Sequence, residues 1–482
     1  MNNRPVVIGI GAIQQKGNLK DLDEALILME QATQKAIKDS TNVNIKNHLD
    51  EISVPKGFWK YRDPGKWIAK RNDFKNVKTS VSKIGVLQQN LLNAACNKIL
   101  NGEINASLIL GGESRYKMLR SQIENQKYIA TELNTNPDNY IKAADDLTLK
   151  EEERELGSMA VGYYAILESA FRASSKKELK DHNRDIANLY SSFSQLASDN
   201  DAGWIDKPIE ASLIEQQSKK NPLQAYPYNK YHCTSWNVNQ SCAIIICSES
   251  LADKLDIPIS KRVYPLASSE TNHMIPTLQR PDLINPIGMK LAANFILDIC
   301  KENKLKVDDY DLYSCFPVAV QMFAKSLGLN SNSQMTITGG MPFAGGPLNS
   351  YVLHSTVKLI SRIRERKNGL GIITGVSGMM TKQSYALWSK NPDISFTHKD
   401  FTDNAKHLEK PVEISNQQKG EGIIIGYTII KKDDLSKAIM FLSTTSDEKR
   451  KLITSSDESI IKLMEKKEWV GKKVYFEKNQ LI

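Results

Sequence analysis

The chain has 482 residues, more than one compact core normally supports, so two or three domains are expected. Hydrophobic residues make up 40% and charged residues 25%, a composition that is typical of globular proteins and excludes global disorder. Lysine plus arginine number 64 against 55 acidic residues, and the resulting charge of +9 is spread along the chain. Such a charge would attract a phosphorylated small molecule as well as a nucleic acid, so it does not distinguish these two classes of ligand.

The cysteine pattern and the hydropathy exclude several further classes. The six cysteines form no CxxC pair, so no zinc or iron–sulfur site is expected. No apolar window reaches the roughly 18 residues that a membrane span needs. The apolar start at residues 5–11 is too short for a signal peptide, and we therefore expect a cytoplasmic protein.

The first part of the chain alternates between strand and helix patterns. Residues 6–10 and 106–110 are short apolar runs typical of strands, whereas residues 22–36 and 87–100 carry apolar residues at helical spacing. This alternation predicts an α/β unit with buried strands over residues 1–255.

A polar, helix-rich segment interrupts that unit at about residues 116–230, and we interpret it as an insertion. A second α/β unit is predicted over residues 256–395. Gly85 lies 26 residues before Gly111, and Gly345 lies 30 residues before Gly375, each pair enclosing a helix and a strand. This spacing indicates a duplicated βα unit.

The C-terminal part differs from both units. Residues 396–419 are polar and have no clear period, which is typical of a linker. Residues 420–482 contain short apolar runs between polar spacers and predict a small β-rich domain with one helix near 458–466.

The segment 338–347 is the least ordinary of the chain, because it holds four glycines and two prolines. Glycine allows positive φ and a close approach of the backbone, so this loop before a helix is a candidate for ligand binding. The alternative is tight packing of the loop against the helix. The candidate binding residues of the loop are Gly339, Gly340, Gly345, Gly346 and Pro347.

Four motifs resemble those of one enzyme family. Residues 336–347 are similar to the thiolase box NxxGGxxxxGHPxGxSG, and the Tyr-Ser-Cys-Phe run at 313–316 is similar to the HDCF or NEAF box. Residues 111–114 match GGxES, and residues 237–243 resemble the segment before the last strand of the first half. Over about residues 5–390 the chain therefore resembles the thiolase superfamily, most closely the thiolase-like proteins of type 1, which carry GGP in place of GHP.

The resemblance implies two βαβαβαββ halves in a five-layer α/β/α/β/α arrangement, followed by a small OB-like domain. It also implies an acyltransferase of the acetyl-CoA acetyltransferase type in lipid metabolism. Coenzyme A or an acyl-CoA is then the substrate or ligand, and no permanently bound cofactor or metal is expected.

By the same resemblance, the positions of the thiolase catalytic residues carry other residue types in this chain. The nucleophilic cysteine falls on Gly85, the second cysteine falls near Thr374, and the box histidine is Gly346. Tyr313 stands where the family has histidine or asparagine. Because a nucleophile and its base act as a unit, the usual thiolase reaction is not expected.

Three residues are candidates for replacement roles. Cys315 precedes a helix start that could activate a thiol, and His354 lies in the helix after the glycine-rich loop, so both are candidate catalytic residues. A packed core cysteine and a core histidine are the alternatives. Tyr228, in an aromatic segment at 226–232, is a candidate for stacking on the adenine of coenzyme A, with an ordinary proline-turned loop as the alternative.

Two functions follow from these residues. One is acyl transfer from acyl-CoA with an unusual residue set. The other is a non-catalytic acyl-CoA-binding or assembly protein, in which the C-terminal domain contacts a partner or a second copy of the chain. Nucleic-acid binding through the barrel-like domain rests on fold analogy alone and is not expected.

Overall fold

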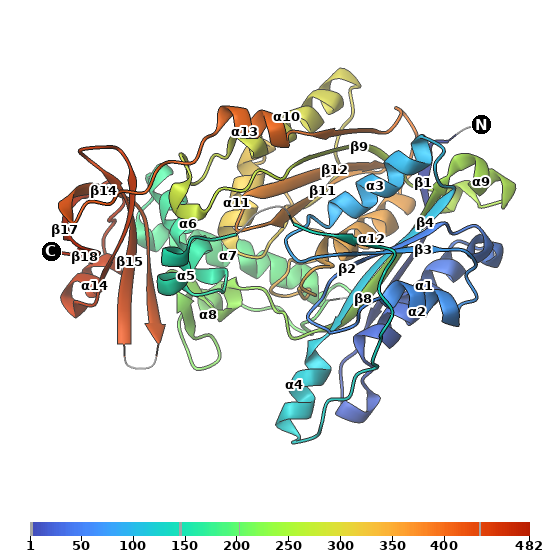
Figure 1. Ribbon diagram of the computed structural model, residues 1–482, viewed down its shortest axis with the longest axis horizontal. Helices are drawn as coiled ribbons and strands as arrows, with labels where there is room; N and C mark the ends of the chain where they lie inside the picture. Colours follow the sequence, from blue (N-terminus) through green and yellow to red (C-terminus); the bar gives the residue numbers. More distant parts are fainter. Residues whose placement is uncertain (1–2, 144–146, 202, 433–434) are drawn as a thin grey trace.

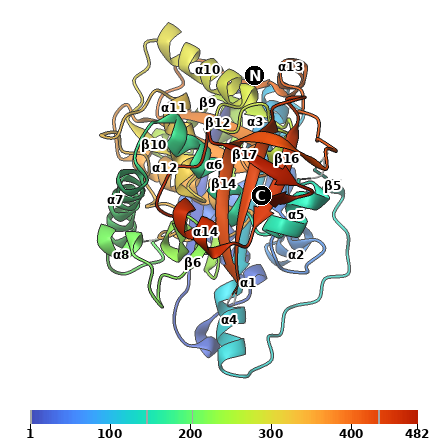
Figure 2. The same ribbon diagram turned by 90° about the vertical axis from the view of Figure 1, so that its left-hand side faces the viewer.

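The computed structural model describes residues 3–143, 147–201, 203–432 and 435–482. Two β-sheets, with helices between and outside them, form the larger part, and a barrel lies at the opposite end of the long axis (Figure 1). Figure 2 shows the molecule from the side of the barrel. No helix within the described ranges is both long and apolar enough to cross a bilayer.

The first sheet has six strands. In spatial order they are β1 (Pro5–Gln14), β8 (Asn239–Ser248), β4 (Ala106–Ser114), β2 (Glu51–Pro55), β3 (Lys78–Ser82) and β5 (Asn139–Ile141). β8 pairs antiparallel with β1 and β4, and β4 pairs parallel with β2. Every residue of β8 is buried, which explains its nearly continuous apolar run.

The second sheet repeats this pattern. Its strands, in spatial order, are β13 (Thr397–Asp400), β9 (Tyr264–Thr271), β12 (Lys382–Ser389), β11 (Leu370–Ser377) and β10 (Asp309–Asp311). β12 pairs antiparallel with β9 and β11, and β11 pairs parallel with β10. The order β1-β8-β4-β2 in the first sheet matches β9-β12-β11-β10 in the second, with the same relative directions, and this supports the duplication. The sheets differ at their edges, where β3 and β5 extend the first sheet beyond β2 and β13 extends the second beyond β9.

Helices complete five layers (Figure 1). The outer helices of the first sheet are α1 (Ala25–Asp39) and α2 (Pro64–Arg71), those between the sheets are α3 (Gln89–Leu100) and α12 (Tyr351–Arg364), and those outside the second sheet are α10 (Ile287–Glu302) and α13 (Thr402–Leu408). α3 packs against both β8 and β12, and α12 against both β8 and β11. The predicted α/β/α/β/α arrangement is confirmed.

The elements of the chain between β4 and β8 are mainly helices. Its elements are α4 (Arg115–Ile123), α5 (Lys150–Leu156), α6 (Val161–Ser174), α7 (Leu179–Ser198), α8 (Ala211–Glu215), β6 (Leu223–Ala225) and β7 (Tyr228–Asn229). The same stretch also supplies β5, which pairs with β3 and so covers that edge of the first sheet. Two further helices lie elsewhere, α9 (Glu249–Lys254) and α11 (Pro317–Ser326), the latter with proline at its first turn.

The segment 396–419 is more ordered than a linker. It contains β13, which pairs in parallel with β9, and α13, which packs against α10. Both elements are too short to show a hydrophobic periodicity, which is why the sequence of residues 396–419 resembles that of a linker.

The last residues form a closed barrel, consistent with an OB-like domain. Its elements are β14 (Lys419–Lys432), β15 (Leu435–Thr444), β16 (Arg450–Ser455), α14 (Glu458–Met464), β17 (Lys473–Glu477) and β18 (Gln480–Leu481). β14 packs against α6. At this contact the fully buried Arg172 forms an ion pair with Glu468 at 2.8 Å and donates a hydrogen bond to the Tyr427 hydroxyl at 3.0 Å.

Substitution Glu468→Gln tests how strongly this ion pair holds the barrel to α6. We expect a loss of about 2–3 kcal/mol in the free energy of unfolding, because the buried Arg172 guanidinium then lacks its carboxylate. Urea unfolding followed by circular dichroism measures the loss. Substitution Glu458→Gln is the control, since Glu458 pairs with Lys462 at 79% side-chain exposure, and equal effects of the two variants would contradict the role of Arg172.

Candidate functional site

Gly85, which the family resemblance places at the position of the thiolase nucleophile, lies in a turn before α3 with φ at +103°. A Cβ atom at this glycine would lie 2.9 Å from the Cβ of Ala143. The Gly85 carbonyl accepts a hydrogen bond from the buried Lys382 Nζ at 3.2 Å. A cysteine at this position would therefore need both an unfavourable backbone conformation and displacement of Ala143.

Gly346 is the residue that the family resemblance places at the position of the box histidine, and the space beside it is occupied by Thr234. A Cβ atom here would lie 2.1 Å from the Thr234 Cγ2, far inside van der Waals contact. The Gly346 N–H donates to the Ser235 carbonyl at 2.9 Å, which fixes the two segments together. Thr234 therefore occupies the space into which a histidine side chain at residue 346 would project.

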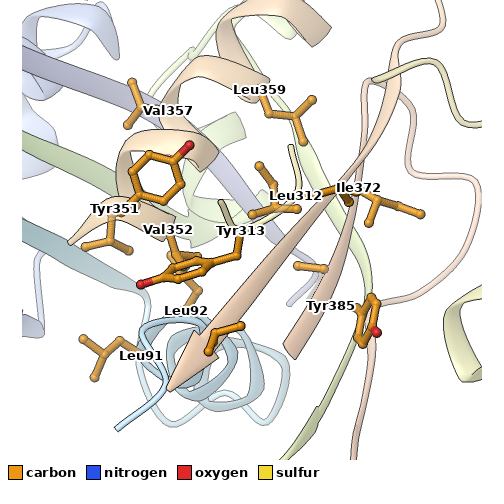
Figure 3. Close-up of a cluster of buried hydrophobic side chains, with 14 of the residues drawn as sticks. Leu91, Leu92, Leu312, Tyr313, Tyr351, Val352, Val357, Leu359, Ile372 and Tyr385 are labelled. Carbon is orange, nitrogen blue, oxygen red and sulfur yellow. The ribbon is translucent and has the colours of Figure 1, made fainter. Parts of the chain in front are cut away.

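Thr374 and Tyr313 hold each other in place. The Thr374 hydroxyl accepts a hydrogen bond from the Tyr313 N–H at 2.8 Å. The Tyr313 ring packs edge to face on Tyr351 at 5.8 Å between centroids, within a cluster of buried side chains from α3, α12 and β11 (Figure 3). Both residues thus serve packing, and neither supplies a thiol or a base.

Cys315 is buried, with 8% of its surface exposed. Burial raises the pKa of its thiol to about 12, and contacts with the Tyr164 hydroxyl and with nearby backbone N–H groups offset only part of that rise. At neutral pH the thiol is then almost entirely protonated. This environment is that of a packed core cysteine, and it does not favour the predicted nucleophilic role.

Tyr228 is fully buried and is not placed to stack on a ligand. Its hydroxyl donates to the Glu168 carboxylate at 2.5 Å, and its ring stacks on Phe316 at 5.5 Å. His182 and the Gln321 side chain complete the surroundings of Glu168, at 2.6 Å and 2.8 Å. This polar cluster around the Glu168 carboxylate could not be predicted from the sequence, because its members come from four separate elements.

His354 and Gly345 meet in a cavity of about 620 Å³ between α1, α12 and the edge strand β1. The His354 Nε2 atom is buried and has no hydrogen-bond partner among the residues that the structure describes. Burial lowers the pKa of His354 to about 3, so the imidazole is neutral at physiological pH. A neutral imidazole can orient a polar ligand, and this agrees better with the predicted site than the surroundings of Cys315 do.

The glycine-rich loop is divided between packing and the cavity. Gly339 and Gly340 pack against Ala197 and Phe193 of α7, so tight packing explains them. Gly345 lines the cavity with φ at +95°. Pro347 and Gly346 lie outside its lining, where the Pro347 carbonyl accepts a hydrogen bond from the Ser350 N–H at 2.9 Å.

Charged groups on the cavity wall were not foreseen from the sequence. Four lysines line it, at positions 35, 38, 261 and 358. The spacing of Lys35 and Lys38 on α1 is visible in the sequence, but nothing in the sequence shows that α12 lines the same cavity.

No three His, Cys, Asp or Glu side chains come together as a metal site in the ranges that the structure describes.

Comparison with known proteins gives a consistent answer about the fold. The structure of a monomeric SCP2-thiolase-like protein type 1 from Mycobacterium smegmatis matches 100% of this chain and 99% of its own, with a TM-score of 0.83 and 21% identity. An acetyl-CoA acetyltransferase from Syntrophomonas wolfei has a TM-score of 0.55 and 15% identity over 81% of this chain and 100% of its own. The chain has the thiolase fold.

A third similar structure is a thiolase from Ascaris suum in complex with coenzyme A, with a TM-score of 0.51 and 16% identity over 80% of this chain and 100% of its own. No family model and no curated protein matches the sequence significantly. The evidence for the thiolase fold is thus structural, together with the four motifs.

Substitution Gly346→Ala tests whether Thr234 fills the histidine position. We expect it to lower the free energy of unfolding by about 2 kcal/mol, because the added methyl group overlaps the Thr234 Cγ2. In a Thr234→Ala background, which removes that atom, the same change is expected to cost much less. Urea unfolding of the two single variants and the double variant measures the coupling, and additive costs would contradict the overlap.

The low pKa of His354 predicts a pH dependence. The unfolded chain binds a proton near pH 6.5, whereas the folded chain binds it only near pH 3. Stability is therefore lost as the pH falls from about 6.5 toward 3, by up to about 1.4 kcal/mol per pH unit from this residue. Urea unfolding between pH 4.5 and 7.5 is expected to show a shallower loss for His354→Gln, and equal slopes would contradict the burial of this imidazole.

Proposed function

We propose that this chain is a thiolase-fold protein that binds coenzyme A or an acyl-CoA without forming an acyl-enzyme. The observation that carries the proposal is the state of the former catalytic centre. Ala143 faces Gly85, and Thr234 fills the space beside Gly346. Neither position can supply the nucleophile or the base of the thiolase reaction.

A ligand role is supported by what the fold keeps. The glycine-rich loop is retained, and Gly345 lines a cavity whose volume lies in the usual range for small-molecule sites. The proposed ligand follows from the family resemblance, and the similar Ascaris suum thiolase was solved with coenzyme A. The proposed interior contact is His354, a neutral imidazole with one unpartnered nitrogen among the described residues.

Acyl transfer through a relocated nucleophile is the competing function. It requires Cys315 to ionise, and burial opposes this by raising the pKa of the thiol to about 12. An acyl transfer between two bound ligands, without a covalent intermediate, remains compatible with the proposal because it needs no thiolate. The experiment below separates covalent from non-covalent binding.

Calorimetric titration with coenzyme A, acetyl-CoA and a longer acyl-CoA, followed by intact-protein mass spectrometry, tests the proposal. We expect saturable binding and no added acyl mass, because no ionised thiol is available. A Cys315→Ala variant is expected to bind each ligand with the same affinity as the wild-type protein.

Two results would contradict the proposal in different ways. An acyl mass on the wild-type protein that is absent from Cys315→Ala would make the protein a covalent acyltransferase. Absence of binding by all three ligands would reduce the resemblance to a shared fold.

A further inference from the structure

The cavity beside His354 opens at the edge of the first sheet. β1 is the outermost strand there, and its residues 10–12 form one wall. The C-terminal half of α1 and the middle of α12 form two further walls. None of the residues at the former thiolase centre, Gly85, Tyr313, Gly346 and Thr374, lines the cavity.

The inner part of the cavity is buried and largely apolar. Ala344, Gly345 and Tyr351 are buried there, and Val357 has 9% of its surface exposed. Polar side chains also line it, namely Gln240, Thr338 and His354, and the His354 Nε2 has no hydrogen-bond partner in the part of the chain that the structure describes. The Nε2 atom is itself shielded from solvent, so the cavity presents the partly exposed remainder of His354 to a ligand.

The outer part is basic. Lys35 and Lys38 are exposed on α1, and Lys358 faces them from α12. Lys35 Nζ contacts the Ala12 carbonyl at 3.1 Å and Lys358 Nζ contacts the Asn200 side-chain oxygen at 3.0 Å, both neutral acceptors. Within the described ranges none of these three ammonium groups forms an ion pair, so their charges are available to a ligand.

Of the two aspartates on the wall, Asp39 is already paired. Its carboxylate contacts Lys261 Nζ at 2.7 Å and Arg364 at 2.6 Å, and it accepts the Ile10 N–H at 2.9 Å. Burial acts to raise the pKa of Asp39, but Arg364 and Lys261 outweigh it and hold that pKa below its usual value. The other aspartate, Asp201, is exposed, and the rim as a whole keeps an excess of positive charge.

Two further cavities among the described residues differ from this one. A groove of about 980 Å³ along α7 and α11 also contains lysine, but its Lys177 is paired with Asp185 at 2.5 Å. A shallow cavity of about 630 Å³ shares Lys38 and adds Lys46, but its Arg71 is paired with Glu30 at 2.7 Å and Asp73 also lines it. The unpaired lysines of the His354 cavity therefore distinguish it from both.

We infer that this cavity binds a phosphorylated ligand that enters at the β1 edge. Its phosphate groups contact Lys35, Lys38 and Lys358, and its uncharged part lies against His354. Lysine ammonium groups bind phosphate as point charges, and an apolar interior suits the uncharged arm that carries the phosphate. The inference rests on the proposed function only for naming coenzyme A as the ligand.

Calorimetric titration with coenzyme A, inorganic pyrophosphate and pantetheine tests the inference on four proteins. They are the wild type, Lys35→Gln/Lys38→Gln, His354→Leu and the control Lys466→Gln/Lys467→Gln, which removes two exposed lysines of the barrel. We expect the two substitutions on α1 to weaken the binding of coenzyme A and of pyrophosphate at least tenfold. The control pair is expected to change neither affinity. Pantetheine, which lacks phosphate, is expected to bind at least tenfold more weakly than coenzyme A.

His354→Leu separates the two parts of the cavity. This substitution is expected to weaken the binding of coenzyme A severalfold and to leave the affinity for pyrophosphate unchanged, because only the uncharged arm reaches the imidazole. Circular dichroism and the thermal midpoint show whether each variant is folded, and the lysine variants change only exposed side chains.

The outcomes distinguish this inference from the proposed function. If coenzyme A binds equally to the wild type, the α1 variant and the barrel control, the phosphate site is wrong and the proposed function stands. If neither coenzyme A nor the two acyl-CoAs bind but pyrophosphate does, and only the α1 variant loses pyrophosphate binding, the phosphate site stands and the proposed function is wrong. If coenzyme A, the two acyl-CoAs and pyrophosphate all fail to bind, both are wrong.

Discussion

Close packing where the two halves meet decides what this thiolase fold can do. Thr234, from the segment before β8, lies where a histidine at residue 346 would project, and Ala143 faces the position of the nucleophile at Gly85. Because protein interiors are closely packed, a histidine at residue 346 or a cysteine at residue 85 would require these neighbours to move. The same loop places Gly345 on the wall of an open cavity, so one short segment separates the filled centre from the available site.

Electrostatics follow the same division. The two candidate catalytic groups are kept neutral, because burial raises the pKa of Cys315 to about 12 and lowers that of His354 to about 3. The lysines of α1 stay exposed to water and keep their charge. An interior without an ionised nucleophile, next to a basic rim, favours recognition of an anionic ligand over covalent chemistry.

The sequence predicted the architecture well because buried strands and glycine spacing are local signals. The apolar run of β8 and the repeated distance from Gly85 and Gly345 to the strand-terminal glycines indicated two related halves. The site was harder, because it depends on contacts between distant segments. Nothing local shows that Tyr228 is buried on Glu168, or that α1 brings two lysines opposite α12. β13 and α13 escaped notice because each is too short to show a period.

A crystal structure of the protein in complex with coenzyme A tests this account most directly. We predict that the phosphates lie against Lys35, Lys38 and Lys358, that the pantetheine arm reaches His354, and that no covalent bond joins protein and ligand. Coenzyme A bound instead with its thiol beside Gly85 and Gly346, after displacement of Ala143 and Thr234, would contradict the account and return the site to the former thiolase centre.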